Sequence, residues 1–311
     1  MRAVRMHDYG GIDVLRVEDA PVPEPAAGEV RVRVVGAAVN PVDWKIRRGY
    51  LRQDIPHRFP LVPGWDVSGV VDAVGEQATR FKVGDAVYSR PDIARDGTYA
   101  EFVVIRETEL AAKPRTISHI EAASLPLAGI TAYQALVDIA QVQPGQRVLV
   151  HAAAGGVGSL AVQIAKARGA QVIGTASGAN RALVESLGVD QFVDYRREAL
   201  APAVREVDVV FDTLGGDVQE ASWALLKPGG VLVSVVNPPP QKRAQAHGVR
   251  GEFLFIGPNA TVLAELARMV EAGRLRPVIG AEFALRDIAR AHELSESGRA
   301  RGKIVLYVGT P

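Results

Sequence analysis

The spacing of apolar and polar residues changes near residue 115 and divides the chain into two regions. Before that point, residues 29–35 alternate between charged and apolar side chains, which is typical of a half-buried β-strand. Further short apolar runs, at 63–71 and 97–105, are bounded by glycine turns and predict more strands. After residue 115, strand-like runs alternate with segments of helical period, which indicates a doubly wound parallel sheet. The sequence therefore predicts a β-rich region followed by an α/β region.

The α/β region has the more regular pattern. Ser118 and Glu121 form a capping box that predicts the start of its first helix. A final segment, 278–308, is expected to form a strand, a helix and a strand. The expected strands of the parallel sheet are 147–151, 171–175, 191–194, 207–211, 231–235 and Phe253–Ile256, and the expected helices are 157–168, 179–187, about 198–205, 217–226 and 259–273.

A strand, a turn of small residues and a helix follow one another within residues 147–165. This order is typical of a dinucleotide-binding unit, in which the turn and the first helical N–H groups meet a pyrophosphate. The first glycine of the usual G-x-G-x-x-G pattern is replaced by Ala153, so a glycine-rich turn without a ligand is the alternative. The candidate pyrophosphate contacts are Ala153, Gly155, Gly156, Val157 and Gly158.

The end of the second strand indicates which dinucleotide would bind. An NAD-binding unit has an acidic residue there, but no Asp or Glu occurs after this strand until Glu185. Thr175, Ser177 and Arg181 instead offer hydroxyl groups and a guanidinium, which suit the 2′-phosphate of NADPH. The alternative is that Ser177 caps the next helix and Arg181 is solvated. The sequence favours NADPH.

The composition excludes several classes of function. The 36 basic and 35 acidic residues give a net charge of +1, which gives no reason to expect nucleic acid or a membrane surface as partner. There is no cysteine, and the six histidines are scattered without metal-ligand spacing, so no metal site is expected. No apolar run suggests a transmembrane helix or a signal peptide, and the expectation is a cytoplasmic enzyme.

Several motifs together resemble one enzyme family, the medium-chain dehydrogenase/reductase superfamily in its zinc-free quinone oxidoreductase branch, close to alkenal and enone reductases. They are NPVDWKIRRG at 40–49, PGWDVSGVV at 63–71, GTYAEFVV at 97–104, AASLPLAGITAYQAL at 122–136, VLVHAAAGGVGSLAVQIAK at 148–166, FVDYR at 192–196 and GKIVLYV at 302–308. Zinc-dependent relatives have Gly-His-Glu at the position of Gly64-Trp65-Asp66 and cysteine at that of Asn40, and both departures agree with a metal-free site.

The resemblance implies an α/β protein with two domains and an active site between them. A GroES-like, β-rich catalytic domain would comprise residues 1–115 and 275–311, and a Rossmann NADPH-binding domain residues 116–274. The resemblance also implies a homodimer that pairs edge strands of the Rossmann sheets, with Phe253–Ile256 as the candidate edge. Besides the glycine turn, Thr175, Ser177 and Arg181, the implied cofactor-binding residues are Asn40, Lys45, Thr131, Tyr195, Leu214, Val235, Val236, Phe255, Ile256 and Lys303.

Lys45 and Asn40 are the candidate catalytic residues. Hydride delivery to the β-carbon of an enone builds negative charge on the carbonyl oxygen, and a cation there stabilises it by a few kcal/mol in comparable oxyanion sites. The alternative is that Lys45 only contacts the cofactor or is solvated. The expected function is NADPH-dependent hydride transfer to an enone, an alkenal or a quinone. An NADPH-binding sensor or structural protein with little catalysis, and an enoyl-thioester reductase, are the alternatives.

Overall fold

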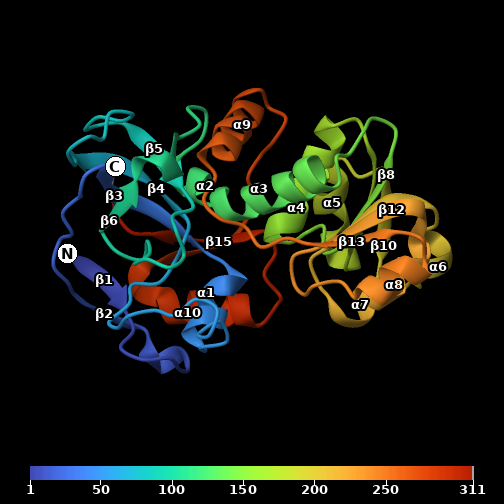
Figure 1. Cartoon of the computed structure of the whole chain (residues 1–311), viewed down its shortest axis with the longest axis horizontal. Coiled ribbons are helices and arrows are strands. Elements are labelled where there is room, and N and C mark those ends of the chain that lie inside the picture. Colours follow the sequence, from blue (N-terminus) through green and yellow to red (C-terminus); the bar gives the residue numbers. More distant parts are fainter. Residues whose placement is uncertain (310–311) are drawn as a thin grey trace. The chain divides into compact units, whose positions relative to one another are not determined.

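The computed structural model describes residues 1–309, which form two compact units. Unit 1 comprises Met1–Leu127, Gly257–Gly273 and the chain from Pro277 onward, and unit 2 comprises Ala128–Ile256 and Arg274–Arg276. Figure 1 labels the elements of both units. Within the described residues, no helix combines the length and the apolar character needed to cross a membrane.

Unit 1 is built on a seven-stranded sheet in the order β14-β15-β3-β4-β5-β7, with β6 paired to β3, and on a two-stranded β1-β2 sheet. Only β14 and β15 run parallel among the pairs of the larger sheet in the described chain. The strands are β1 (Arg2–Arg5), β2 (Arg16–Asp19), β3 (Glu29–Val39), β4 (Val67–Val74), β5 (Ala86–Ser89), β6 (Phe102–Arg106), β7 (Leu110–Ala112), β14 (Ile279–Ala284) and β15 (Lys303–Tyr307).

The strand β3 is the centre of unit 1, because it pairs with β4, β6 and β15. Because its apolar residues alternate with charged ones, Val30, Val32 and Val34 share one face of the strand and pack in a core that also contains Val67 and Val71. Burial of each such side chain contributes about 1.5–3 kcal/mol. The pairing of β15 with β3 also returns the C-terminal strand–helix–strand segment to the N-terminal region, as the sequence resemblance implied.

Four helices belong to unit 1, and a fifth, α3 (Pro126–Tyr133), begins in unit 1 and continues into unit 2. The capping box predicted from Ser118 and Glu121 is present at the start of α2. The four helices are α1 (Pro41–Arg47), α2 (His119–Ala123), α9 (Ala260–Glu271) and α10 (Ile288–Glu296).

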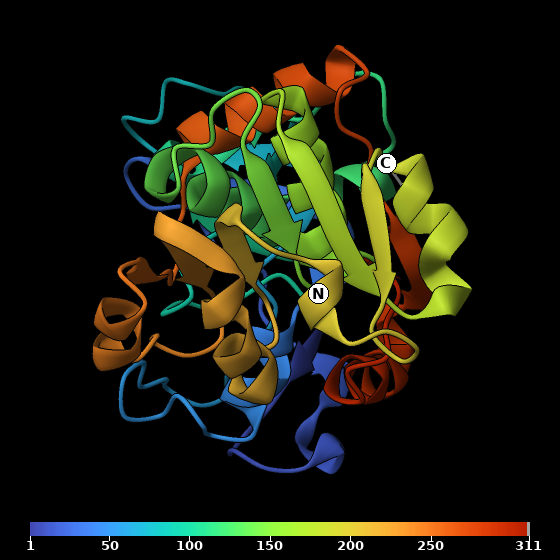
Figure 2. The ribbon, with the colours of Figure 1, turned by 90° about the vertical axis from the view of Figure 1, so that its right-hand side faces the viewer.

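Unit 2 is the predicted doubly wound sheet, with six strands in the order β10-β9-β8-β11-β12-β13 and every pair parallel (Figure 2). This 3-2-1-4-5-6 order is that of a dinucleotide-binding fold. The strands are β8 (Arg147–Val150), β9 (Gln171–Ala176), β10 (Gln191–Asp194), β11 (Val207–Asp212), β12 (Leu226–Ser234) and β13 (Arg250–Phe253), and the helices are α4 (Gly156–Ala167), α5 (Arg181–Ser186), α6 (Leu200–Ala203), α7 (Gly216–Ser222) and α8 (Gln241–Ala246).

Three local elements differ from the sequence-based expectation. The sixth strand, expected at Phe253–Ile256, is β13 at Arg250–Phe253, where it pairs with residues 231–234 of β12, and it ends level with Ser234, the last residue of β12. The helix expected at about 198–205 is only the short α6, because Val204 has extended backbone angles. The segment after Asn237, for which no helix was expected, contains the helix α8.

The division into units differs from the expected domain boundaries in its assignment of 116–127 and of α9. Both belong to unit 1, because Leu127 N donates to Asp66 Oδ1 (2.7 Å) and Arg115 Nε pairs with Glu271 Oε1 of α9 (3.1 Å). The hydroxyl of Tyr88 in β5 also donates to the carbonyl of Leu263. A repeating β-α pattern could not reveal these contacts, which join residues far apart in the sequence.

Candidate active site

The turn between β8 and α4 has the geometry of a phosphate cradle. A Cβ atom on Gly158 would lie 2.2 Å from the carbonyl oxygen of Ala152, so only glycine allows the helix to start so close to the turn. Gly155 is the N-cap of α4 and provides no side-chain cap, which leaves the first N–H groups of this 12-residue helix for another acceptor. Gly155, Gly156 and Val157 are partly exposed. These features fit the pyrophosphate of a dinucleotide.

His151, at the end of β8, connects the turn to the neighbouring strand. Ser222 Oγ donates to Val218 O (2.6 Å), so it accepts from His151 Nε2, which lies 2.9 Å away. Nδ1 of His151 is then unprotonated and accepts from Thr175 Oγ1 at 3.2 Å. Burial lowers the pKa of His151 to about 4, which keeps the imidazole neutral in this arrangement.

These contacts change the interpretation of Thr175. Its side chain is buried, and its hydroxyl hydrogen is donated to His151. The hydroxyl therefore already has a partner inside unit 2, and its backbone supports the turn through a bond from Ala153 N to Thr175 O (2.9 Å). Direct contact of the Thr175 hydroxyl with a 2′-phosphate is not supported by this geometry.

Arg181 and Ser177 lie beyond the end of β9 and remain accessible. Arg181 is about half exposed, and its guanidinium lies 4.3 Å from the centroid of the Phe192 ring. Its Nη1 is 3.2 Å from Glu185 Oε1 on the same face of α5. Ser177 is partly exposed and accepts a bond from Asn180 Nδ2 (3.2 Å). The aromatic ring and the carboxylate thus hold a cation at the end of the second strand.

Tyr195, after β10, adds to this surface. Its side chain is 59% exposed, and the guanidinium of the next residue, Arg196, lies 5.7 Å from its ring centroid. The turn is fixed by Asp194, a buried residue whose Oδ1 accepts from Arg196 N (3.1 Å). An exposed aromatic ring beside an arginine side chain suits the adenosine and phosphate end of a dinucleotide.

The end of β11 is organised by Asp212, a fully buried residue. Its Oδ1 accepts from the N–H groups of Leu214 (3.0 Å) and Gly215 (2.8 Å). Its Oδ2 accepts from Gln219 Nε2 and Ser234 Oγ, each at 2.9 Å. Asp212 therefore fixes the loops that carry three predicted cofactor contacts, which are the exposed Leu214 and the partly exposed Val235 and Val236.

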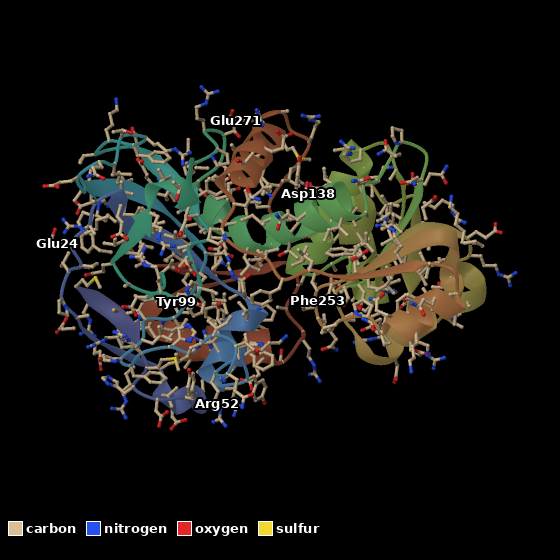
Figure 3. The ribbon with its side chains drawn as sticks, in the orientation of Figure 1. Glu24, Arg52, Tyr99, Asp138, Phe253 and Glu271 are labelled. Carbon is tan, nitrogen blue, oxygen red and sulfur yellow. The ribbon has the colours of Figure 1, made fainter. Side chains whose placement is uncertain are left out.

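The remaining predicted contacts of unit 2 differ in their exposure. Thr131 is a buried residue of α3, and Ile256 is also buried. Phe255 is 56% exposed and Phe253, just before it at the end of β13, is 41% exposed (Figure 3). Their roles at a cofactor remain predictions.

In unit 1, Asn40 belongs to a buried polar cluster with Asp66 and Lys303. Asn40 Nδ2 donates to Asp66 Oδ2 at 2.9 Å, and Lys303 Nζ donates both to Asp66 Oδ2 at 2.9 Å and to Asn40 Oδ1. All three residues are at most 5% exposed. Lys303 Nζ, predicted to contact a cofactor, therefore has two partners inside unit 1. The bonds also fix the orientation of the Asn40 amide, and one of its N–H hydrogens is used by Asp66.

Asp43 and Tyr99 extend this cluster. Asp43 Oδ2 accepts from Tyr99 Oη (2.6 Å) and from Asn40 N (2.7 Å), and the second bond completes the capping box of α1. Burial raises the pKa of Asp43 to about 7, although these two hydrogen bonds act in the opposite direction. Tyr99 lies inside unit 1 with its ring fully buried (Figure 3).

Lys45 lies on α1, between the buried residues Asp43 and Ile46. It is half-buried, and burial lowers the pKa of its ammonium below the ordinary value of 10.5. Its Nζ is 5.9 Å from the centroid of the Trp44 ring, and no ion pair to Lys45 is present among residues 1–309. A desolvated ammonium without a carboxylate partner is available to a substrate oxygen.

No group of three or more His, Asp or Glu residues in the described part of the chain is placed to hold a metal ion. At the position where zinc-dependent relatives have their ligands, Asn40 and Asp66 bond to each other and to the Lys303 ammonium. This donor set therefore fits a cationic side chain in place of a metal.

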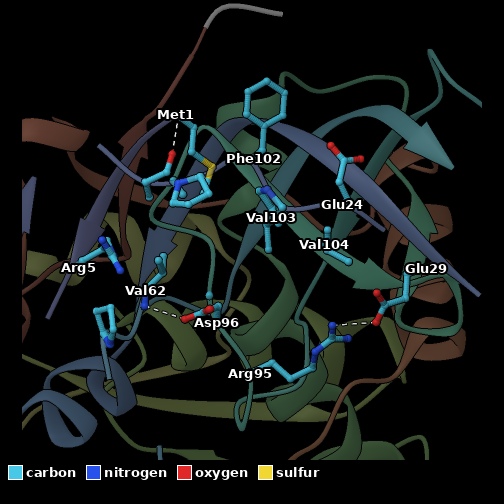
Figure 4. Close-up of a pocket in the computed structure, with 16 residues that line it drawn as sticks. Met1, Arg5, Glu24, Glu29, Val62, Arg95, Asp96, Phe102, Val103 and Val104 are labelled. Carbon is cyan, nitrogen blue, oxygen red and sulfur yellow. Dashed lines mark hydrogen bonds and ion pairs between the residues drawn. The ribbon is translucent and has the colours of Figure 1, made fainter. Parts of the chain in front are cut away.

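A cavity of about 310 Å³ lies elsewhere in unit 1, between β1, β6 and the Pro21–Pro23 segment (Figure 4). At its wall, Arg95 Nη2 pairs with Glu29 Oε1 at 2.8 Å, and Val62 N donates to Asp96 Oδ1 at 2.9 Å. Neither Lys45 nor Lys303 lines it. We assign this cavity no part in the reaction.

The chain matches two families of known domains. Residues 26–115 match the alcohol dehydrogenase GroES-like domain, and residues 187–306 match the zinc-binding dehydrogenase domain. Together with the two-unit architecture and the cradle at α4, these matches define a dehydrogenase or reductase of the medium-chain type. The chain belongs to the medium-chain dehydrogenase/reductase superfamily.

Relatives and solved structures place it within the zinc-free quinone oxidoreductase branch. The chain is 38% identical to the NADPH-dependent alkenal/one oxidoreductase of Arabidopsis thaliana chloroplasts, over 99% of its own length and 79% of that protein. The quinone oxidoreductase of Coxiella burnetii is similar with a TM-score of 0.92 and 35% identity, covering 99% of both chains. The Escherichia coli quinone oxidoreductase, solved in complex with NADPH, is similar with a TM-score of 0.89 and 28% identity, covering 99% of this chain and 100% of that one.

Several residues that organise the site escaped the sequence analysis. Asp212 follows a buried strand and precedes Thr-Leu-Gly-Gly, which is a signal for an Asp side chain that bonds the following turn. Asp43, three residues after Asn40, has the spacing of a capping box. Tyr99 gave no comparable signal, because its partner Asp43 lies 56 positions away in the sequence.

Proposed function

We propose that this protein is an NADPH-dependent oxidoreductase that reduces enones, alkenals or quinones without a metal. The relatives are named as an NADPH-dependent alkenal/one oxidoreductase and as quinone oxidoreductases, and these names agree with the chemistry expected from the sequence. The observation that carries the assignment to an activated C=C bond is Lys45, a half-buried ammonium without an ion-pair partner in the described structure.

The choice of NADPH is supported by the end of β9. Arg181 is held over Phe192 and remains about half exposed, and no carboxylate follows the strand before Glu185. The 2′-phosphate would be recognised by Arg181, Ser177 and the Tyr195 surface. The turn from Ala153 to Gly158 would hold the pyrophosphate on the first N–H groups of α4.

When bound, NADPH supplies a hydride from its nicotinamide ring. For an enone, that hydride would add to the β-carbon, the C=C electrons would form a double bond between the α-carbon and the carbonyl carbon, and the C=O π electrons would move to the oxygen, which becomes an enolate oxygen. The Lys45 ammonium would donate a hydrogen bond to that oxygen and stabilise its developing charge. A proton from water then adds to the α-carbon and gives the saturated ketone.

Absorbance at 340 nm with a panel of enones, alkenals and quinones tests this function. Lys45→Met is expected to lower kcat for enones about 100-fold, as the loss of a donor at an oxyanion does, with an unchanged Kd for NADPH. Lys82→Met, at an exposed lysine of unit 1, is the matched control and should leave both values unchanged. Tight NADPH binding without turnover of any panel member would support a non-catalytic role instead.

We also propose a homodimer that forms by pairing of β13 edges. The strand β13 is at the edge of the sheet in unit 2, and Phe253 and Phe255 expose 41% and 56% of their surfaces there. An unpaired edge with exposed aromatic residues favours association. Sedimentation should give a dimer for the wild type and a monomer for Phe253→Lys. Equal masses for the two proteins would reject this interface.

A cytoplasmic location completes the proposal, and it rests on the sequence pattern alone. Fractionation of the source cells should recover NADPH-dependent enone reduction in the cytosolic fraction. Recovery in an organelle or with membranes would contradict it.

A further inference from the structure

A group of charged residues around the buried Arg47 joins α1 to α10 in unit 1, and the proposed reaction does not use it directly. Arg47, at the end of α1, is completely buried, and its Nη2 donates to Glu296 Oε2 of α10 at 2.6 Å. The neighbouring Arg48 donates to the other oxygen of Glu296, at 2.7 Å from Nη2 and 3.0 Å from Nε. One carboxylate therefore binds two consecutive guanidinium groups.

His292 completes this group one turn earlier in α10. Its Nδ1 lies 3.4 Å from Arg47 Nη1, and because a guanidinium can only donate, the imidazole accepts and carries its hydrogen on Nε2. The Tyr99 ring packs edge-on against His292, with centroids 5.8 Å apart. Glu296, which is partly exposed, is thus the ionised partner of the fully buried Arg47.

The opposite end of α1 is fixed as well. Asn40 is its N-cap, and Asn40 and Asp43 bond to Asp66 and Tyr99 in the buried cluster described above. The helix has seven residues, so each end lies within one turn of its middle. Polar bonds at both ends restrict its translation and its rotation about its own axis.

The buried face of α1 consists of Asp43, Ile46 and Arg47, at positions i, i+3 and i+4. Lys45 lies on another side of the helix and is only half-buried. Because successive residues are separated by about 100° around a helix, a fixed Arg47 sets the direction in which Lys45 points. A helix this short has little stability of its own, so its orientation depends on such contacts.

We propose that Arg47 and Glu296 are a positioning pair, which holds α1 so that the Lys45 ammonium meets the substrate oxygen. This inference rests on the proposed function of Lys45. Neither Arg47 nor Glu296 contacts the reacting atoms in this account. Their effect on the reaction passes through the position of Lys45, since a displacement of about 1 Å at a catalytic group costs up to 100-fold in rate.

The test is a double-mutant cycle on the purified full-length protein, with Glu296→Ala and Lys45→Met alone and combined. Glu296→Ala is expected to lower kcat for an enone about 10-fold, with unchanged KM for NADPH. In the Lys45→Met background the same change should alter kcat less than about twofold. Glu296→Gln, which keeps an acceptor and the packing, should lie between wild type and Glu296→Ala. Glu293→Ala, at an exposed glutamate of the same helix, is the control.

The possible results separate this inference from the function on which it rests. Full activity of Lys45→Met would show that Lys45 has no part in the reaction, and both the proposed function of Lys45 and its positioning by this pair would then be wrong. Reduced activity of Lys45→Met together with normal kcat of Glu296→Ala overturns the positioning pair alone. An equal loss from Glu296→Ala in both backgrounds also overturns it, because the effect would then not pass through Lys45. If Glu296→Ala fails to fold, Glu296→Gln decides by the same two comparisons.

Discussion

Units 1 and 2 bury charge in different ways. Unit 1 buries both signs, with Arg47, Arg90 and Lys303 among its hidden cations and Asp43 and Asp66 among its hidden carboxylates. In unit 2, within the described residues, the buried ionisable groups other than His151 are the carboxylates Asp194, Asp208 and Asp212. Arginines of unit 2 such as Arg181 remain at the surface.

The buried charges have different structural roles in the two units. The buried carboxylates of unit 2 accept from backbone N–H groups of the strands and turns, as Asp212 does from Leu214 and Gly215, and fix the loops at the ends of the strands. The exposed arginines are then free to meet phosphate. In unit 1, buried ion pairs hold strands and the short helix α1 in one arrangement. Under the proposed function, unit 1 would orient the reactive group and unit 2 would present the binding surface for the dinucleotide.

The largest effect is expected from Asp66→Ala. This change leaves the buried Lys303 ammonium without its carboxylate, and loss of one partner of a buried pair costs about 3–5 kcal/mol. Asp208→Ala is the comparison in unit 2, where Asp208 accepts from Arg147 N at 2.8 Å and pairs with the half-exposed Lys227. Its expected cost is about 1–2 kcal/mol. Hydrogen exchange of peptides from each unit measures the loss of stability that each substitution causes. Equal destabilisation by the two substitutions would contradict the proposed difference in how the two units use their buried charges.

A smaller effect, common to both units, is expected from acid. Burial lowers the pKa of His151 in unit 2 to about 4 and that of His292 in unit 1 to about 3. In the unfolded chain a histidine has a pKa near 6.5 and binds a proton below that pH, whereas in the folded protein these two histidines stay neutral. Their contribution to stability is therefore complete above about pH 6.5 and decreases progressively as the pH falls toward 4.

For His151 the loss amounts to about 3 kcal/mol between pH 6.5 and 4. His151→Gln should therefore make the free energy of unfolding less steep in this range, as measured by urea denaturation at several pH values. His247→Gln, at an exposed histidine of the same unit, is the control. A slope unchanged by His151→Gln would show that the imidazole is already accessible to protons in the folded protein.

The smallest effect concerns the surface of unit 2. Arg181→Ala should raise the KM for NADPH about 10- to 100-fold, since a hydrogen bond to a charged group contributes about 1.5–3 kcal/mol. The KM for NADH, which has no 2′-phosphate, should stay the same. Arg274→Ala removes an exposed arginine of the same unit and serves as control. A parallel rise for both coenzymes would indicate a contact elsewhere on the dinucleotide.

Much of unit 2 could be predicted from the sequence, because its strands and helices have distinct periods and its glycine turn has a known geometry. Five of the six parallel strands overlap the expected runs closely, whereas the sixth lies three residues earlier than expected, at Arg250–Phe253 in place of Phe253–Ile256. For unit 1 the sequence predicted strands, turns and several helices, but not how the strands pair. Its pairings, such as β3 with β15, join residues more than 250 positions apart and leave no periodic signal.

The same reason explains what the sequence revealed of the site. The turn from Ala153 to Gly158 and the accessible Arg181 could be found from local patterns. The bonds of Thr175 to His151 and of Lys303 to Asn40 could not, because each depends on a contact between separate elements. These contacts use side-chain atoms of Thr175 and Lys303, two residues that the sequence predicted to contact the cofactor.

Transfer of deuterium from NADPH labelled at both C4 positions tests the central claim most directly. The protein would be incubated with this NADPH and a simple α,β-unsaturated ketone, and the product analysed by NMR and mass spectrometry. Hydride addition to the activated C=C bond predicts a saturated ketone with one deuterium on its β-carbon. An allylic alcohol with deuterium on the former carbonyl carbon, or a product without deuterium, would contradict it.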